Sequence, residues 1–186
     1  MKLGIVGPSE SKWPLELIPS AIQEIYQIFL ENWSWNPMAS EPDKESQITL
    51  VSGGCHLGGV DIWAEIVADD LGTIKKEIYK ADIHQWHDKR IMTPSGYYGQ
   101  RLPVCTGIMN GYKSRNIKIA KAIDMLYCVV PYKPQATCKH CNEEGHPSNG
   151  GCWTMQYAKK LGKHTELDII FPQMLTPWKI NERNYW

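Results

Sequence analysis

The sequence predicts an α/β fold in which a parallel sheet of about five strands carries helices on both faces. Short apolar runs alternate with longer stretches of helical periodicity along the chain, which is typical of such folds. The run at residues 125–130 is apolar throughout, as in a central parallel strand covered on both faces. Residues 48–72 read as a strand, a turn of small residues and a helix, the connection that parallel strands need.

Each element follows from a local pattern. Strands are expected from β-rich or apolar runs at residues 2–6, 48–51, 73–79, 125–130 and 167–171. Helices are expected from apolar residues at helical spacing at residues 14–33, 60–71, 111–123 and 152–161. Gly72 and Gly162 supply helix ends, and Pro19 should lie near the start of its helix. Residues 81–110 lack clear periodicity and are expected to form a functional loop region or short helices.

Bulk properties narrow the class of protein. The 186 residues suit a single domain (1–186), with a Cys/His loop insertion at about 131–151 and an aromatic tail at about 172–186. Lysine plus arginine and aspartate plus glutamate both number 20, which disfavours nucleic acid as a partner. No apolar run approaches the length of a membrane span. The start of the chain turns polar too soon for a signal peptide, so a cytoplasmic location with reduced cysteines is expected.

Aromatic usage predicts self-association. The chain has eight tryptophans and nine tyrosines but only two phenylalanines. Tryptophan and tyrosine combine an apolar body with a polar group and therefore suit half-buried sites, ligand walls and interfaces. Together with Trp178 and Trp186 in the tail, this bias predicts a homo-oligomer, a dimer or larger.

The glycine-rich turn after the second expected strand points to an anion. Ser52, Gly53 and Gly54 end that strand, and a second pair, Gly58 and Gly59, opens the following helix. Such a turn aims backbone N–H groups and the positive end of a helix dipole at a phosphate. The alternative is that these glycines serve only turn geometry and the packing of helix on sheet.

A cysteine and histidine cluster in the loop before the last helix predicts a structural zinc site. The spacing is Cys138-x2-Cys141-x4-His146-x5-Cys152, close to that of a zinc knuckle. A polar loop without a core of its own would gain order from such a metal. His140 is a substitute ligand, and free thiols or a disulfide are the alternatives.

Four short motifs in a fixed order carry a resemblance to a known superfamily. They are the Gly-Pro-Ser loop at residues 7–9, VSGGCHLGGVD at 51–61, the Arg-Asn pair at 115–116 and GGCWT at 150–154. Over residues 3–170 the chain resembles the SLOG superfamily of Rossmann-like proteins. This superfamily includes the LOG (so-called lysine decarboxylase) proteins, DprA-type domains and YspA-like proteins.

The resemblance implies a nucleotide or nucleotide-derived phosphate ligand in a cleft at the carboxyl ends of the strands. The residues assigned to this ligand are Gly7, Pro8, Ser9, Ser52, Gly53, Gly54, Gly58, Asp61, Arg115, Asn116, Gly150, Gly151 and Thr154. Glycine N–H groups and the hydroxyl groups would contact the anion, and Arg115 could bind a phosphate bidentately. Two alternatives remain open at this point: Asp61 complements a helix dipole, and Arg115 caps a surface helix pair.

One departure from the LOG pattern bears on catalysis. LOG phosphoribohydrolases carry P-G-G-x-G-T-x-x-E, but here Tyr157 stands at the glutamate position and Trp153 replaces the third glycine. Because that chemistry needs a carboxylate, a ligand-binding or sensing protein is the first expectation. The alternative is a hydrolase that cleaves an N-glycosidic or phosphate bond of a nucleotide. Its candidate catalytic groups are Asp61, Asp82, His84 and His87.

Overall fold

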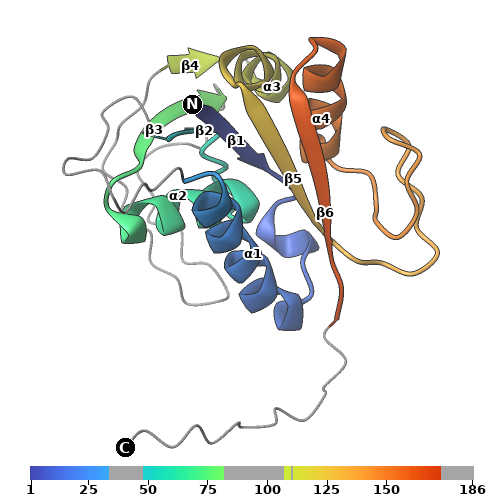
Figure 1. The fold of residues 1–186 in the computed structure, drawn as a ribbon. Helices are drawn as coiled ribbons and strands as arrows, with labels where there is room; N and C mark the ends of the chain where they lie inside the picture. The colour runs from blue at the N-terminus through green and yellow to red at the C-terminus, as the bar shows by residue number, and fades with distance from the viewer. Residues whose placement is uncertain (34–47, 82–106, 110, 173–186) are drawn as a thin grey trace, which may run out of the picture.

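The described part of the chain forms a six-stranded sheet with the order β4-β3-β2-β1-β5-β6, in which every neighbouring pair is parallel (Figure 1). The computed structural model describes residues 1–33, 48–81, 107–109 and 111–172. The strands are β1 (Lys2–Val6), β2 (Thr49–Ser52), β3 (Lys75–Ala81), β4 (Gly107–Met109), β5 (Met125–Pro131) and β6 (His164–Ile170). The helices are α1 (Ile18–Glu31), α2 (Val60–Leu71), α3 (Gly111–Ala122) and α4 (Gly150–Lys160).

The predicted fold class is confirmed, and the differences lie in local detail. The sheet has a sixth strand, β4, within the stretch that the sequence pattern left unassigned. A strand of three residues is too short to show alternation, so no pattern could identify it. The first helix begins at Ile18 rather than residue 14, because residues 10–12 and 15–17 form short 3-10 turns, η1 (Glu10–Lys12) and η2 (Leu15–Leu17). Pro19 lies in its first turn, as expected.

Helices cover both faces of the sheet. α1 and α2 pack on one face, and α3 and α4 pack on the other (Figure 1). The uniformly apolar β5 serves both layers, because successive side chains of a strand point to opposite faces. Tyr127 and Val129 join the core under α1 and α2, whereas Leu126, Cys128 and Val130 join the core under α3 and α4.

The strand order places a switch point beside β1. From β1 the chain proceeds through β2 and β3 to β4 on one side, and then crosses to β5 and β6 on the other side. In parallel sheets, the crevice outside the carboxyl ends at such a point is the usual ligand site. The loop at residues 7–9 after β1 and the loop at 132–149 after β5 both leave this end of the sheet (Figure 1).

Among the described residues, none of the helices combines the length and apolarity that a membrane crossing requires.

Candidate functional site

The loop between β5 and α4 brings four metal-ligating side chains together. One ligand atom from each of Cys138, Cys141, His146 and Cys152 lies within 4.8 Å of all the others. The Sγ atoms of Cys138 and Cys152 are 3.4 Å apart, and Cys141 Sγ is 3.3 Å from His146 Nε2. All but the half-buried Cys141 are buried. This set, named the Cys/His cluster below, could hold a metal ion.

A tight turn shapes the first two ligands. The Cys138 N–H donates to Glu143 O at 2.9 Å, and the Asn142 N–H donates to Cys138 O at 2.8 Å. Asn142 adopts a φ of 63°, in the left-handed region that asparagine tolerates better than most residues. Residues 137 and 144 form an antiparallel bridge across this turn. The turn therefore holds Cys138 and Cys141 close together in the loop.

The protonation of the thiols reflects this geometry. Burial raises the pKa of Cys138, but backbone N–H donors of Cys141 and His140 outweigh it and bring the pKa below its ordinary value. Burial raises the pKa of Cys141 to about 12. A hydrogen bond with Cys128, together with burial, raises the pKa of Cys152 far above its ordinary value. A bound divalent cation would reverse these two increases, because a coordinated thiol loses its proton.

The histidine is oriented for metal binding through Nε2. His146 Nδ1 lies 3.2 Å from Pro147 O, and a carbonyl oxygen only accepts, so Nδ1 carries the hydrogen. The lone pair of Nε2 then faces Cys141 Sγ. A backbone carbonyl that fixes the tautomer in this way is the usual partner of a metal-bound histidine. Three thiolates and one imidazole, all from the protein, match the closed tetrahedral site of structural zinc.

The predicted ligand residues meet at the carboxyl ends of β1 and β2. We use the name ligand edge for the loop at 7–9, the turn at 52–54, Arg115 with Asn116, and the start of α4 at 150–151. An added Cβ at Gly7 would lie 2.3 Å from Val129 O, and one at Gly151 would lie 2.6 Å from Gly7 Cα. At Gly150 an added Cβ would meet only Asn116 Nδ2, at 3.7 Å. Gly7 and Gly151 are therefore required by close packing, whereas Gly150 borders open space.

Arg115 lies inside this edge and not on a surface. Its side chain is buried, with Nη1 3.7 Å from Asp61 Oδ2 and 3.4 Å from Gly53 O. Its Nε donates to Asn116 Oδ1 at 3.0 Å. An added Cβ at Gly53 would lie 2.7 Å from Asp61 Oδ2 and 2.8 Å from Arg115 Cζ. The glycine turn thus packs directly on a buried ion pair that joins α2 to α3.

Three predicted polar groups already have internal hydrogen bonds. Ser52 Oγ donates to Glu65 Oε1 at 2.6 Å and accepts from the Gly54 N–H at 3.0 Å. Thr154 Oγ1 donates to Gly150 O at 2.8 Å, within its own helix. Pro8 O accepts from the Val60 N–H at 3.5 Å, at the start of α2. These groups shape the ligand edge from within the protein.

Two further residues of the predicted site contribute few contacts, and several candidates lie outside the described residues. Ser9 is half-buried at the start of η1, where its side chain makes no capping hydrogen bond. Gly58 has a φ of 73°, which its turn requires. The catalytic candidates Asp82, His84 and His87 lie outside the described residues, as do Trp178 and Trp186.

The site also contains residues that the sequence analysis does not identify. Glu65 is buried one helical turn after Asp61 and holds Ser52. The Tyr112 ring lies 5.1 Å from Arg115 Cζ, and its hydroxyl is 3.2 Å from His56 Nδ1. The spacing of four residues from Asp61 to Glu65 is a signal that could have identified Glu65 as facing the same way. No sequence pattern links Tyr112 to His56, because their proximity depends on how α3 packs.

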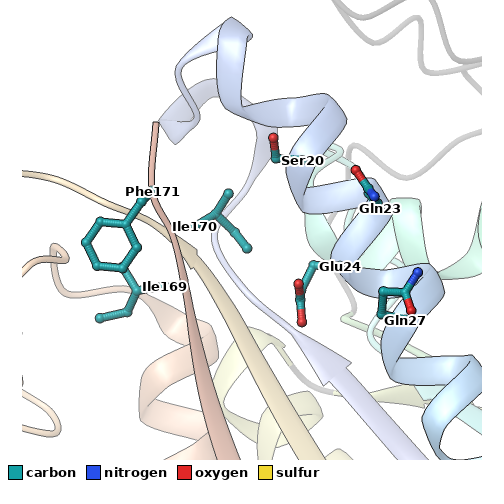
Figure 2. Close-up of a pocket in the computed structure, with 7 residues that line it drawn as sticks. All are labelled: Ser20, Gln23, Glu24, Gln27, Ile169, Ile170 and Phe171. Carbon is teal, nitrogen blue, oxygen red and sulfur yellow. The ribbon is translucent and has the colours of Figure 1, made fainter. Parts of the chain in front are cut away.

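A separate pocket of about 300 Å³ lies between α1 and the end of β6 (Figure 2). Its lining residues are Ser20, Gln23, Glu24 and Gln27 of α1, with Ile169, Ile170 and Phe171 at the end of the strand. It shares no residue with the ligand edge or the Cys/His cluster.

Comparisons of the chain with protein-family models, curated proteins and solved structures give no match. The resemblance to the SLOG superfamily therefore stays a prediction from the motifs.

Proposed function

We propose that the chain binds a nucleotide or nucleotide-derived phosphate compound at the ligand edge, as a binding or sensing protein. The observation that supports this most is the setting of Arg115. A hydrogen bond from Nε to Asn116 Oδ1, at 3.0 Å, orients the guanidinium beside the turn at Gly53 and Gly54. Its contacts to Asp61 and Gly53 O, at 3.7 and 3.4 Å, are longer than charge-assisted hydrogen bonds of about 2.8 Å. Arg115 also interacts with the Cys55 thiol. Because a guanidinium has five N–H donors, it can still donate to an oxyanion next to the turn.

The test is calorimetric titration with AMP, ADP-ribose and inorganic phosphate. We expect binding to the wild-type chain and an affinity at least about tenfold weaker in Arg115→Gln, because a hydrogen bond to a charged group contributes roughly 1.5–3 kcal/mol. Lys121→Gln is the matched control, since it removes one positive charge from an exposed position on the same helix. Thermal melting checks that the Arg115 variant is folded. No binding of any probe, or equal affinity in both variants, would contradict the proposal.

A second candidate, hydrolysis of an N-glycosidic or phosphate bond, is favoured by one observation. The Asp61 carboxylate is buried at the ligand edge, close to Gly53. A hydrolase would release a free base, a sugar phosphate or inorganic phosphate from the nucleotide panel, and Asp61→Asn would abolish that release. Unchanged nucleotides after prolonged incubation with the wild-type chain would leave binding as the function.

We further propose that the Cys/His cluster holds a structural zinc ion in a reducing, cytoplasmic environment, where its cysteines stay available as thiolates. The supporting observations are the donor set and the orientation of His146. Elemental analysis should find one zinc per chain.

A further inference from the structure

We propose that metal in the Cys/His cluster holds the first turn of α4 against the loop after β1, and so sets whether the ligand edge is complete. Its consequence for ligand affinity rests on the proposed function. The ordering of the α4 start does not depend on that function.

Hydrogen bonds connect the metal ligands to the start of α4. Cys152 lies in the first turn of this helix, and its N–H donates to Asn149 Oδ1, the helix cap, at 2.9 Å. Asn149 Nδ2 donates to Pro147 O at 3.2 Å, and His146 Nδ1 donates to the same oxygen at 3.2 Å. Two metal ligands therefore hold the cap residue, one through the helix backbone and the other through a shared carbonyl.

The start of α4 in turn contacts the rest of the ligand edge. Gly151 packs on Gly7 so closely that an added Cβ would lie 2.6 Å from Gly7 Cα. Gly150 O accepts from Asn116 Nδ2 at 3.5 Å, and Asn116 Oδ1 accepts from Arg115 Nε at 3.0 Å. A displacement of this turn would therefore change both the β1 loop and the support of the guanidinium.

The loop at 132–149 has few buried residues to hold it in place. Most residues between 132 and 149 are exposed or half-buried, and those that are buried include the metal ligands Cys138 and His146. Backbone hydrogen bonds such as Cys138 N–H to Glu143 O and Gly145 N–H to Ala136 O shape the loop. Thiols are weak hydrogen-bonding groups, so without a metal the ligand side chains add little to these bonds. Farther along α4, Met155 and Ala158 pack in the core. Metal loss should therefore loosen the loop and the first turn of α4 while the rest of the helix and the sheet stay folded.

Hydrogen exchange measured by mass spectrometry tests this without any ligand. Wild-type protein is compared as zinc-loaded, after treatment with a chelator, and after zinc is added back. We expect faster exchange in residues 132–154 and 5–9 without zinc, restored by zinc, and unchanged exchange in residues 75–81 of β3. Faster exchange confined to residues 132–148 would overturn the inference. Faster exchange throughout the sheet would also overturn it.

A matched pair of variants separates metal loss from the loss of the buried side chain. His146→Cys keeps four ligands and should retain zinc and the exchange pattern of the loaded wild type, whereas His146→Gln should resemble the zinc-free protein. Cobalt substitution reports the ligand set directly, through thiolate-to-metal absorption and the visible bands of a tetrahedral site. If His146→Gln keeps the protected pattern without metal, the inference is wrong.

AMP titration then tests the consequence for ligand binding. We expect at least about tenfold weaker affinity for AMP without zinc, and zinc affinity increased by the same factor when AMP is saturating, because such coupling is reciprocal. Equal AMP affinity with and without zinc would overturn the coupling. If AMP binds in neither state, the proposed function fails for this probe, while the exchange pattern still decides the role of the metal.

Discussion

Gly150 and Gly151, two adjacent glycines at the start of α4, have different surroundings. Gly151 approaches the backbone of Gly7, where no side chain can fit. A Cβ at Gly150 would make only an ordinary contact with Asn116 Nδ2, at 3.7 Å. Because the contact at Gly151 is with backbone, a rotamer change cannot relieve it. The two glycines of the GGCWT motif therefore differ in what they require. Gly151 is needed for close packing, whereas Gly150 has room for a side chain.

We predict opposite outcomes for alanine at these two positions. Gly151→Ala should lower the free energy of unfolding by about 1–3 kcal/mol or more, as overpacking does. Gly150→Ala should leave it unchanged or raise it by up to about 1 kcal/mol, because alanine favours the helix. Urea denaturation measures both. Similar destabilisation by the two variants would show that the close approach to Gly7 does not constrain the helix.

Strand β6 carries a half-buried carboxyl group, Asp168, close to other carboxylates. Asp168 lies on the face of β6 that α1 covers, two residues before the buried Ile170. Among the described residues, its Oδ2 atom has no hydrogen-bond partner. Burial, together with the nearby carboxylates Glu24, Glu166 and Glu31, raises the pKa of Asp168 from 3.8 to about 6. Glu24 also lines the neighbouring pocket (Figure 2).

This increase predicts a loss of stability as the pH rises. Between pH values of about 4 and 6 the folded chain binds more protons at Asp168 than the unfolded chain, so the free energy of unfolding falls with pH and stays lower above 6. Asp168→Asn should therefore stabilise the protein more at pH 8 than at pH 4.5. We expect a difference of about 1 kcal/mol, after allowing for solvent screening of this partly exposed group.

Denaturation at the two pH values measures this difference, with Glu16→Gln as the control at an exposed carboxylate. An Asp168→Asn gain that does not depend on pH would mean that the carboxyl group is not protonated in the folded chain.

For the whole molecule, the proposed metal adds a cross-link at the margin of the apolar core under α3 and α4, which includes Cys138 and Cys152. Apart from Cys138 and the half-buried Cys141, the residues of both cores lie outside the loop at 132–149. We predict that chelation lowers the melting temperature while the far-ultraviolet circular dichroism at room temperature stays almost unchanged. At free zinc a thousandfold above Kd the stabilisation is roughly 4 kcal/mol, or about 10 °C for a chain of this size. Zinc should restore the melting temperature and magnesium should not. Equal melting temperatures with and without chelator would contradict a folding role for the metal.

Local sequence patterns predict most of the elements and the metal-ligand spacing. Within the residues that the structure describes, local patterns predict five of the six strands and all four helices, because an apolar run or a helical period is a property of neighbouring residues. The Cys/His cluster was predicted in the same way, since its four ligands lie within fifteen consecutive residues. The glycine turn at Gly53 and Gly54 is also evident in the sequence, but local patterns do not decide between packing and ligand binding.

The tertiary fold sets which of these parts meet. It placed β4 at the edge of the sheet and β1 beside the switch point. It also brought Arg115 to Gly53 O, 62 positions away in the chain, and Gly151 to Gly7. The physical reason is that such contacts depend on strand order and helix packing. Free energy from burial across the whole core selects these arrangements, and short-range patterns do not record them.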